Sequence, residues 1–102
     1  MMVLATNERP RVNVADELRL ALLRILAPDG RCAECGRRFG VKRLEIDHVH
    51  GRTWSARALS RPQRVLRYWT EYLARVRLRA LCRSCNAIDG NHRRWREERK
   101  AA

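Results

Sequence analysis

The 102-residue sequence predicts a single small domain of the α+β class, and three observations support this prediction. Residues 44–48 and 76–82 alternate apolar and polar side chains, as half-buried strands do. Two longer stretches, before the first strand and between the strands, repeat apolar residues at helical spacing. One Cys-x-x-Cys pair precedes the first strand and another follows the second. Because a chain of this length buries only a modest core, we expect the cysteines to reinforce it.

Residues 1–12 show no apolar period, so we expect a flexible N-terminal segment followed by one domain over residues 13–102. Asn13 or Asp16 could cap a first helix, and Asp16 and Glu17 place negative charge where the helix dipole favours it. Pro28 to Gly30 should end this helix. Its apolar residues recur at helical spacing and predict a packing role: Leu18, Leu22, Ile25 and Leu26.

The two cysteine pairs predict one metal site. A tight turn brings the sulfurs of each pair within reach of one ion, and Gly36 after the first pair permits a positive φ. A redox role for one pair is an alternative, but that role is expected beside a βαβ pattern, which the sequence lacks. Zinc could also use His48 or His50, although four cysteines make this unnecessary. The favoured prediction is a structural zinc site of four thiolates: Cys32, Cys35, Cys82 and Cys85.

Residues 51–81 separate the histidine segment from the second cysteine pair and contain a second predicted helix. Ser60 is a suitable N-cap, and Pro62 lies at an early position that a helix tolerates. One face is apolar, with Val65, Trp69, Tyr72 and Val76, and the polar residues lie largely on the other: Arg64, Arg67, Glu71 and Arg75. Two roles remain open for this helix. In one, its apolar face packs against the domain and its basic face is only exposed to solvent. In the other, the arginines of the basic face contact the phosphates of DNA.

The net charge of +12 and the sequence pI of about 11.3 point to an anionic partner. Arginine supplies nearly all of the positive charge, and its planar fork matches phosphate oxygens. The sequence has no run approaching the roughly 20 apolar residues of a membrane span, so we expect nucleic acid and no membrane. Residues 1–10 lack a signal-type apolar segment, which predicts a cytoplasmic protein.

Asn86 directly follows the last cysteine and should open a final helix that runs to about Lys100, with Gly90 as a weak point. Residues 44–51 read Leu-Glu-Ile-Asp-His-Val-His-Gly. With one Cys-x-x-Cys before them and Leu-Cys-x-x-Cys-Asn after them, they resemble the HNH endonucleases, and most closely the recombination endonuclease VII branch. The resemblance covers about residues 31–92 and departs from the family pattern in the long insertion between the strands.

The resemblance implies a small zinc-stapled ββα-metal domain, here with an added N-terminal helix and a helical insertion between the two strands. It implies a DNA endonuclease that uses one divalent ion, Mg²⁺ or Mn²⁺, and leaves a 5′-phosphate and a 3′-hydroxyl. Asp47 and Asn86 would hold this ion, His48 would be the general base and His50 would have a supporting catalytic role. The family also suggests a homodimer and a phage or prophage origin.

Nucleic-acid contacts are expected from arginines near the site and on the inserted helix: Arg52, Arg64, Arg67, Arg79 and Arg83. The alternative that these arginines only form a solvent-exposed surface explains them nearly as well. The alternative function is a non-catalytic, zinc-stapled basic module that binds DNA or RNA. Such a module explains the charge and the cysteines equally well, but it leaves Asp47 and Asn86 without a role.

Overall fold

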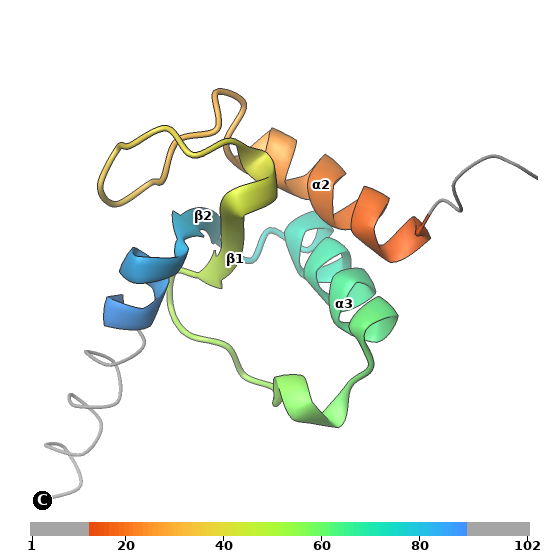
Figure 1. Ribbon diagram of the computed structural model, residues 1–102. Coiled ribbons are helices and arrows are strands. Elements are labelled where there is room, and N and C mark those ends of the chain that lie inside the picture. The colour runs from red at the N-terminus through yellow and green to blue at the C-terminus, as the bar shows by residue number, and fades with distance from the viewer. Residues whose placement is uncertain (1–12, 90–102) are drawn as a thin grey trace, which may run out of the picture.

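The computed structural model describes residues 13–89, so the predicted flexible segment 1–12 and the final helix beyond residue 89 lie outside the described part. The described chain has the predicted α+β composition (Figure 1). A helix also starts at residue 83, directly after the last strand. The elements follow in the order α2 (Val14–Leu26), η1 (Val41–Arg43), β1 (Leu44–His48), η2 (Ala56–Ala58), α3 (Arg61–Leu73) and β2 (Leu78–Cys82).

The two strands form the predicted antiparallel pair, with Leu44 opposite Cys82 and His48 opposite Leu78. Successive side chains of a strand point to opposite faces, so Glu45 and Asp47 share one face of β1. His48 lies on the other face, together with the core residues of the strand. Neighbouring residues of one sequence motif therefore face different parts of the molecule.

The first two predicted helix starts are confirmed, but the final helix starts at residue 83 and not at Asn86, because the second cysteine turn is itself the first turn of this helix. The Asn13 side chain caps α2 by accepting a hydrogen bond of 3.2 Å from the backbone N–H of Asp16. Ser60 caps α3 in a capping box with Gln63, in which each side chain accepts a hydrogen bond from the other residue's backbone N–H. These caps satisfy backbone donors that a helix start leaves without partners, and they set where α2 and α3 begin.

The second strand begins two residues later than predicted because α3 ends in a chain reversal. Arg75 has a φ of 67°, its N–H donates to the Tyr72 carbonyl, and the Val76 N–H donates to the Glu71 carbonyl. This pair of hydrogen bonds is the Schellman motif. The reversal occupies residues 75–77, which the alternating pattern had assigned in part to the strand.

Helices α2 and α3 pack on one side of the strand pair, and the helix from residue 83 lies on the other side (Figure 1). Residues of α2, β1 and β2 form one hydrophobic core, which is centred on fully buried leucines: Leu22, Leu23, Leu44 and Leu81. The Trp69 indole N–H donates a hydrogen bond of 2.8 Å to the Leu18 carbonyl and ties α3 to α2. The inserted helix is thus part of the domain core.

The predicted division of α3 into an apolar and a solvated face is wrong at one residue that matters. Glu71 was expected among the solvated residues, yet only 11% of its side chain is exposed. The loop before η2 folds against this side of α3, and the Trp54 indole N–H donates to Oε1 of Glu71 over 3.1 Å. The periodicity of a helix sequence cannot predict that another segment of the chain will bury one of its polar residues.

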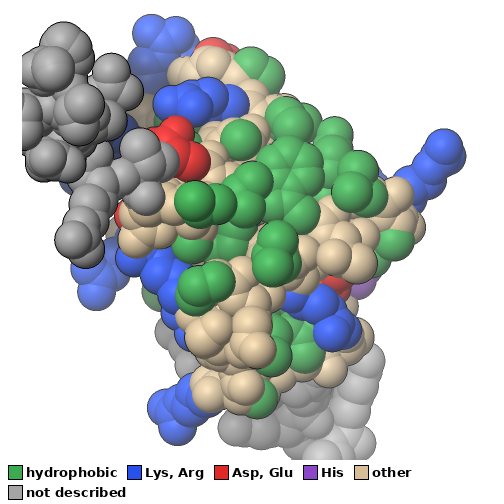
Figure 2. Space-filling model, turned by 90° about the vertical axis from the view of Figure 1, so that its right-hand side faces the viewer, with side chains coloured by type: hydrophobic (Ala, Val, Ile, Leu, Met, Phe, Trp, Pro, Cys, Tyr) green, Lys and Arg blue, Asp and Glu red, His purple; other side chains and the backbone are tan. Residues whose placement is uncertain are grey.

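Several large apolar side chains on α2 and α3 are exposed, among them Ile25, Leu66 and Leu73. Figure 2, which views the side of the molecule formed by α2 and α3, shows hydrophobic side chains gathered there. The homodimer that the family resemblance suggests stays a prediction. Among residues 13–89, no helix is both long and apolar enough to cross a membrane.

Replacing Arg75 with glycine should raise the free energy of unfolding by up to about 1 kcal/mol. A side chain at a left-handed φ costs roughly 1–2 kcal/mol, which glycine avoids, although its greater freedom in the unfolded chain offsets part of the gain. Arg75 is exposed and its side chain is not needed for the core. Chemical denaturation of zinc-loaded protein measures the change. Arg77→Gly is the matched control, since Arg77 is also exposed and lacks the positive φ; an equal gain there would contradict the explanation.

Candidate zinc cluster and candidate active-site cavity

The sulfurs of all four cysteines lie within 4.8 Å of one another, so the predicted cluster forms. A tetrahedral zinc ion with sulfurs at ~2.3 Å holds them about 3.8 Å apart, which needs only a small contraction of this arrangement. Cys32 and Cys82 are buried, Cys85 is half-buried and Cys35 is exposed. The four side chains could hold a structural zinc ion.

Backbone hydrogen bonds bring the two cysteine pairs together. The Gly36 N–H donates to the Cys32 carbonyl over 2.9 Å and closes the first turn, at a positive φ of 73° that favours glycine. Cys82 ends β2, and its sulfur accepts a hydrogen bond from the Cys85 N–H. The Ala33 N–H donates to the Ala80 carbonyl over 2.9 Å and fastens the first turn to β2.

The proton affinities of the thiols differ across the cluster. Burial raises the pKa of Cys32, but hydrogen bonds from the backbone at Cys35, Cys82 and Glu34 outweigh it and lower this pKa to about 6. A side-chain hydrogen bond with Cys82, followed by burial, raises the pKa of Cys85 to about 12. If all four groups were thiolates, their negative charges would repel one another at this separation. A divalent cation would remove that repulsion.

Asp47 is buried on the face of β1 that it shares with Glu45. Its Oδ2 accepts a hydrogen bond of 3.0 Å from Nε of Arg79, the residue directly opposite on β2. Arg79 also forms ion pairs with Glu34 and Asp89. Burial lowers the pKa of Arg79, but the bond to Asp47 and the three carboxylates together raise it above its usual value. Arg79, expected to contact phosphate, is held here by carboxylates, and its nucleic-acid role stays a prediction.

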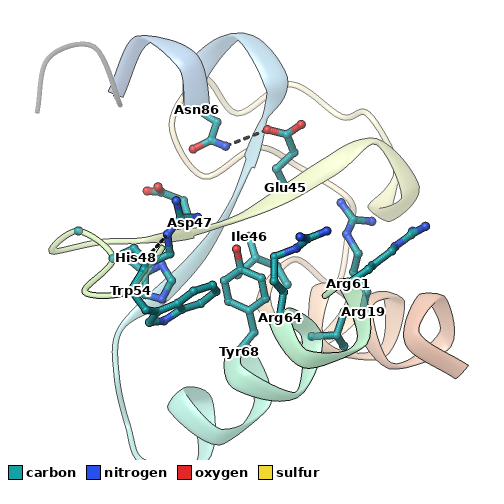
Figure 3. Close-up of a pocket in the computed structure, with 13 residues that line it drawn as sticks. Arg19, Glu45, Ile46, Asp47, His48, Trp54, Arg61, Arg64, Tyr68 and Asn86 are labelled. Carbon is teal, nitrogen blue, oxygen red and sulfur yellow. Dashed lines mark hydrogen bonds between the residues drawn. The ribbon is translucent and has the colours of Figure 1, made fainter. Parts of the chain in front are cut away.

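Asn86 lies in the first turns of the helix that starts at residue 83. Its side-chain N–H donates a hydrogen bond of 2.8 Å to Oε1 of Glu45. A carboxylate can only accept hydrogen bonds, so this contact identifies which end of the amide faces Glu45. Figure 3 shows the amide oxygen turned away from Glu45, toward the side on which Asp47 lies.

His48 is buried on the opposite face of β1, with 5% of its side chain exposed. Its Nε2 lies 2.9 Å from Oε1 of Glu71, the same oxygen that accepts the Trp54 indole N–H. The rings of Trp54 and Tyr68 are centred 5.8 Å and 5.5 Å from the imidazole. The histidine is therefore held by groups from α3 and from the loop before it.

One cavity of about 640 Å³ unites most of the predicted catalytic residues (Figure 3). Asp47, His48 and Asn86 line it from the strand and the final helix. The lining also includes four arginines, from α2, α3 and the loop after β1: Arg19, Arg52, Arg61 and Arg64. His50 is exposed and is not among the lining residues, so its supporting role stays a prediction.

The arginines of this lining are anchored by backbone or side-chain contacts. Arg64 donates to the carbonyls of Ala56 and Leu59, and Arg19 donates to the Leu44 carbonyl. A guanidinium has five N–H donors in a rigid fork, so such anchors use only part of its capacity. Arg61 pairs with Asp16. Arg52 stands over the Trp54 ring, 5.1 Å from its centre. Arg67 is not among the lining residues, but it also stands over this ring, at 5.7 Å.

A second cavity of about 450 Å³ adjoins the first, because Arg19 and Glu45 line both. It contains Arg83, another of the arginines expected to contact nucleic acid. Lys42 and Arg43 from η1 also line it. Basic side chains thus continue from the first cavity along the start of β1.

Sequence reasoning missed four residues of the site: Glu45, Trp54, Tyr68 and Glu71. Glu45 had a signal, since it lies two residues before Asp47 on a predicted strand and so on the same face. The other three had none. Their proximity to His48 depends on how the loop and α3 pack against β1.

The substitution Cys35→Ser should reduce bound zinc well below one ion per chain and lower the melting temperature markedly. Because Cys35 is exposed, replacing it in a protein without bound metal should cost no more than about 0.5 kcal/mol, as surface changes usually do. A larger loss therefore reports ligation, since bound zinc contributes directly to folding. Metal analysis and thermal unfolding measure the two effects. Ser84→Ala, an exposed change beside the second pair, should alter neither; wild-type zinc content in Cys35→Ser would contradict the site.

Acidification should release zinc and destabilise the zinc-loaded fold. The Cys32 pKa is lowered from 9.0 to about 6, and a depressed pKa adds stability that is present above the unfolded value and lost as the pH falls toward 6. Protons also compete with zinc for all four thiolates. Bound zinc, measured with a chromogenic chelator, and the melting temperature should both fall as the pH is lowered through about 6. Constant zinc content down to pH 4 would be inconsistent with thiolate ligands.

Comparisons with known proteins add no assignment. No protein-family model, no curated protein and no solved structure matches the chain. The resemblance to HNH endonucleases therefore rests on the motif residues alone. What the molecule itself displays is a small α+β fold with a two-stranded antiparallel sheet and a cluster of four cysteines that could bind zinc.

Proposed function

We propose that the protein is a DNA endonuclease of the HNH type, which hydrolyses phosphodiester bonds with one divalent ion. The observation that carries the proposal is the shared cavity, which places Asp47, Asn86 and His48 beside a lining of arginines. Hydrolysis of a phosphodiester needs a nucleophile, charge neutralisation at the phosphate and stabilisation of the leaving oxygen. The cavity contains side chains suited to each need. The products would be a 5′-phosphate and a 3′-hydroxyl, as the family resemblance implies.

Asp47 and Asn86 offer oxygen ligands, the donor type that Mg²⁺ and Mn²⁺ prefer. The contact with Glu45 orients the Asn86 amide so that its oxygen faces the Asp47 side. Arg79 binds Asp47 through Oδ2 and fixes the orientation of the carboxylate. Two protein ligands suit Mg²⁺, which usually keeps several waters and binds substrate phosphate. A bound ion would neutralise charge on the phosphate and the leaving oxygen.

His48 would accept the proton of the attacking water, since a histidine can serve as a general base near neutral pH. The arginines of the lining would contact the phosphate under attack and its neighbours along the strand. The second cavity extends these contacts through Arg43 and Arg83. A net charge of +12 supports binding to the DNA backbone over this whole surface.

A specific observation also favours the alternative, a non-catalytic basic module. Both proposed ligands already have partners within the protein, because Asp47 pairs with Arg79 and Asn86 bonds Glu45. A purely structural polar network would have the same contacts. The two functions differ in whether cleaved DNA is formed. The module would bind nucleic acid with strong salt dependence but leave its phosphodiester bonds intact.

Zinc-loaded protein freed of Mg²⁺ should nick supercoiled plasmid only after Mg²⁺ or Mn²⁺ is added, and added zinc alone should have no effect. Asp47→Asn should lower the rate at least about 100-fold, the size of loss typical when one electrostatic stabiliser is removed. Asp29→Asn is the matched control, since this carboxylate is 57% exposed and pairs only with Arg31 among the ion pairs of residues 13–89. Gel analysis of the DNA measures the rates.

Zinc content and circular dichroism must show that the Asp47→Asn protein is folded, and Asn86→Ala provides a second ligand variant. Linear, nicked and branched DNAs extend the assay, because the inserted helix can alter substrate shape preference. Folded wild-type protein that binds these DNAs in a salt-dependent way and cuts none of them with either ion would refute the nuclease and establish the module.

A further inference from the structure

The contact between His48 and Glu71 assigns a role to the inserted helix. We infer that Glu71 is a positioning residue that holds the His48 imidazole in the tautomer with its proton on Nε2. Nδ1 is then the nitrogen that accepts a proton. The catalytic consequence, proton transfer from water to Nδ1, rests on the proposed nuclease function, whereas the tautomer itself does not.

The hydrogen-bond geometry carries the assignment. Oε1 of Glu71 lies 2.9 Å from Nε2 of His48 and 3.1 Å from the indole nitrogen of Trp54. The indole nitrogen can only donate. An ionised carboxylate can only accept hydrogen bonds, so its contact with Nε2 requires a proton on that nitrogen. Oε1 therefore accepts two N–H groups, and one of them is Nε2–H of the histidine.

Burial strengthens this arrangement. The exposed fractions of the two side chains are 5% for His48 and 11% for Glu71. Hydrogen bonds to an ionised carboxylate gain strength where water is excluded. Loss of the Glu71 carboxylate would therefore leave two buried N–H groups without a hydrogen-bond acceptor. The Trp54 and Tyr68 rings pack against the imidazole and limit its rotation (Figure 3). Ring flipping, which would exchange the two nitrogens, is thus opposed by packing and by hydrogen bonding.

The same three groups give the segment between the strands a role beyond packing. Trp54 comes from the loop after β1, and Tyr68 and Glu71 come from successive turns of α3. All three come from residues 49–77, the segment that separates the two strands. In hydrolases with a nucleophile and a general base, a third group commonly orients the base in this way. The insertion supplies that group here.

Nuclear magnetic resonance of ¹⁵N-labelled protein tests the tautomer directly. Long-range proton–nitrogen correlations distinguish a protonated from an unprotonated ring nitrogen, and His50→Asn and His92→Asn variants separate the three histidine signals. Wild-type His48 should show protonated Nε2 at a pH where the imidazole is neutral. Glu71→Leu should yield a mixture of tautomers, and Glu71→Gln, which retains an acceptor oxygen, should keep the wild-type preference.

Cleavage kinetics on the same proteins test the consequence. Glu71→Leu should lower kcat about 100-fold or more with little change in KM for DNA, and Glu71→Gln should restore part of the loss. Glu17→Leu is the matched control, because Glu17 is an exposed helical residue of α2. Zinc content and a cooperative melt must match wild type in each variant.

The outcomes separate the inference from the nuclease proposal. A single unchanged tautomer in Glu71→Leu, or protonated Nδ1 in the wild type, would overturn the inference. An active wild type with unchanged kcat in Glu71→Leu would also overturn it, and the nuclease function would stand. A wild type that shows the expected tautomer and cuts no DNA would refute the nuclease and the catalytic role of Nδ1, while the role of Glu71 in holding the ring would stand.

Discussion

The register of β1 against β2 is the constraint on which the rest of the structure depends. With Asp47 opposite Arg79, the carboxylate faces Glu45 and the final helix, and His48 faces the core and α3. A shift by one residue would exchange these two faces and bury the wrong side chains. The register is well defined because Leu44, Ile46 and Ala80 are buried on one side of the pair.

The cysteine cluster extends this constraint to the final helix. Cys82 ends β2, so the second cysteine turn sets where the helix begins and where Asn86 lies relative to Asp47. The bond from Ala33 to Ala80 ties the first turn to the same strand. A zinc ion in this cluster would thus stabilise the distance between two elements of the cavity, although it would take no part in the chemistry there. The proposed structural and catalytic roles would thus belong to neighbouring residues.

The inserted helix contributes to both stability and site. Trp69 joins it to α2, Val65 reaches the interior, and Glu71 contacts His48. Arg61 and Arg64 from its first turn line the cavity that Asp47 also lines. A helix with these contacts is an integral layer of the fold, and its arginines add positive charge to the cavity lining.

The sequence by itself determined the α+β class, the strand pairing, the helix caps at Asn13 and Ser60, and the grouping of the cysteines. Each of these follows from local signals: alternation, capping side chains and the spacing of ligands. Only the tertiary structure decided the surroundings of His48, the late start of β2 and the anchoring of Arg79 by three carboxylates. Those features depend on which segments meet across the fold, and periodicity along one helix or strand carries no information about the segment that covers it.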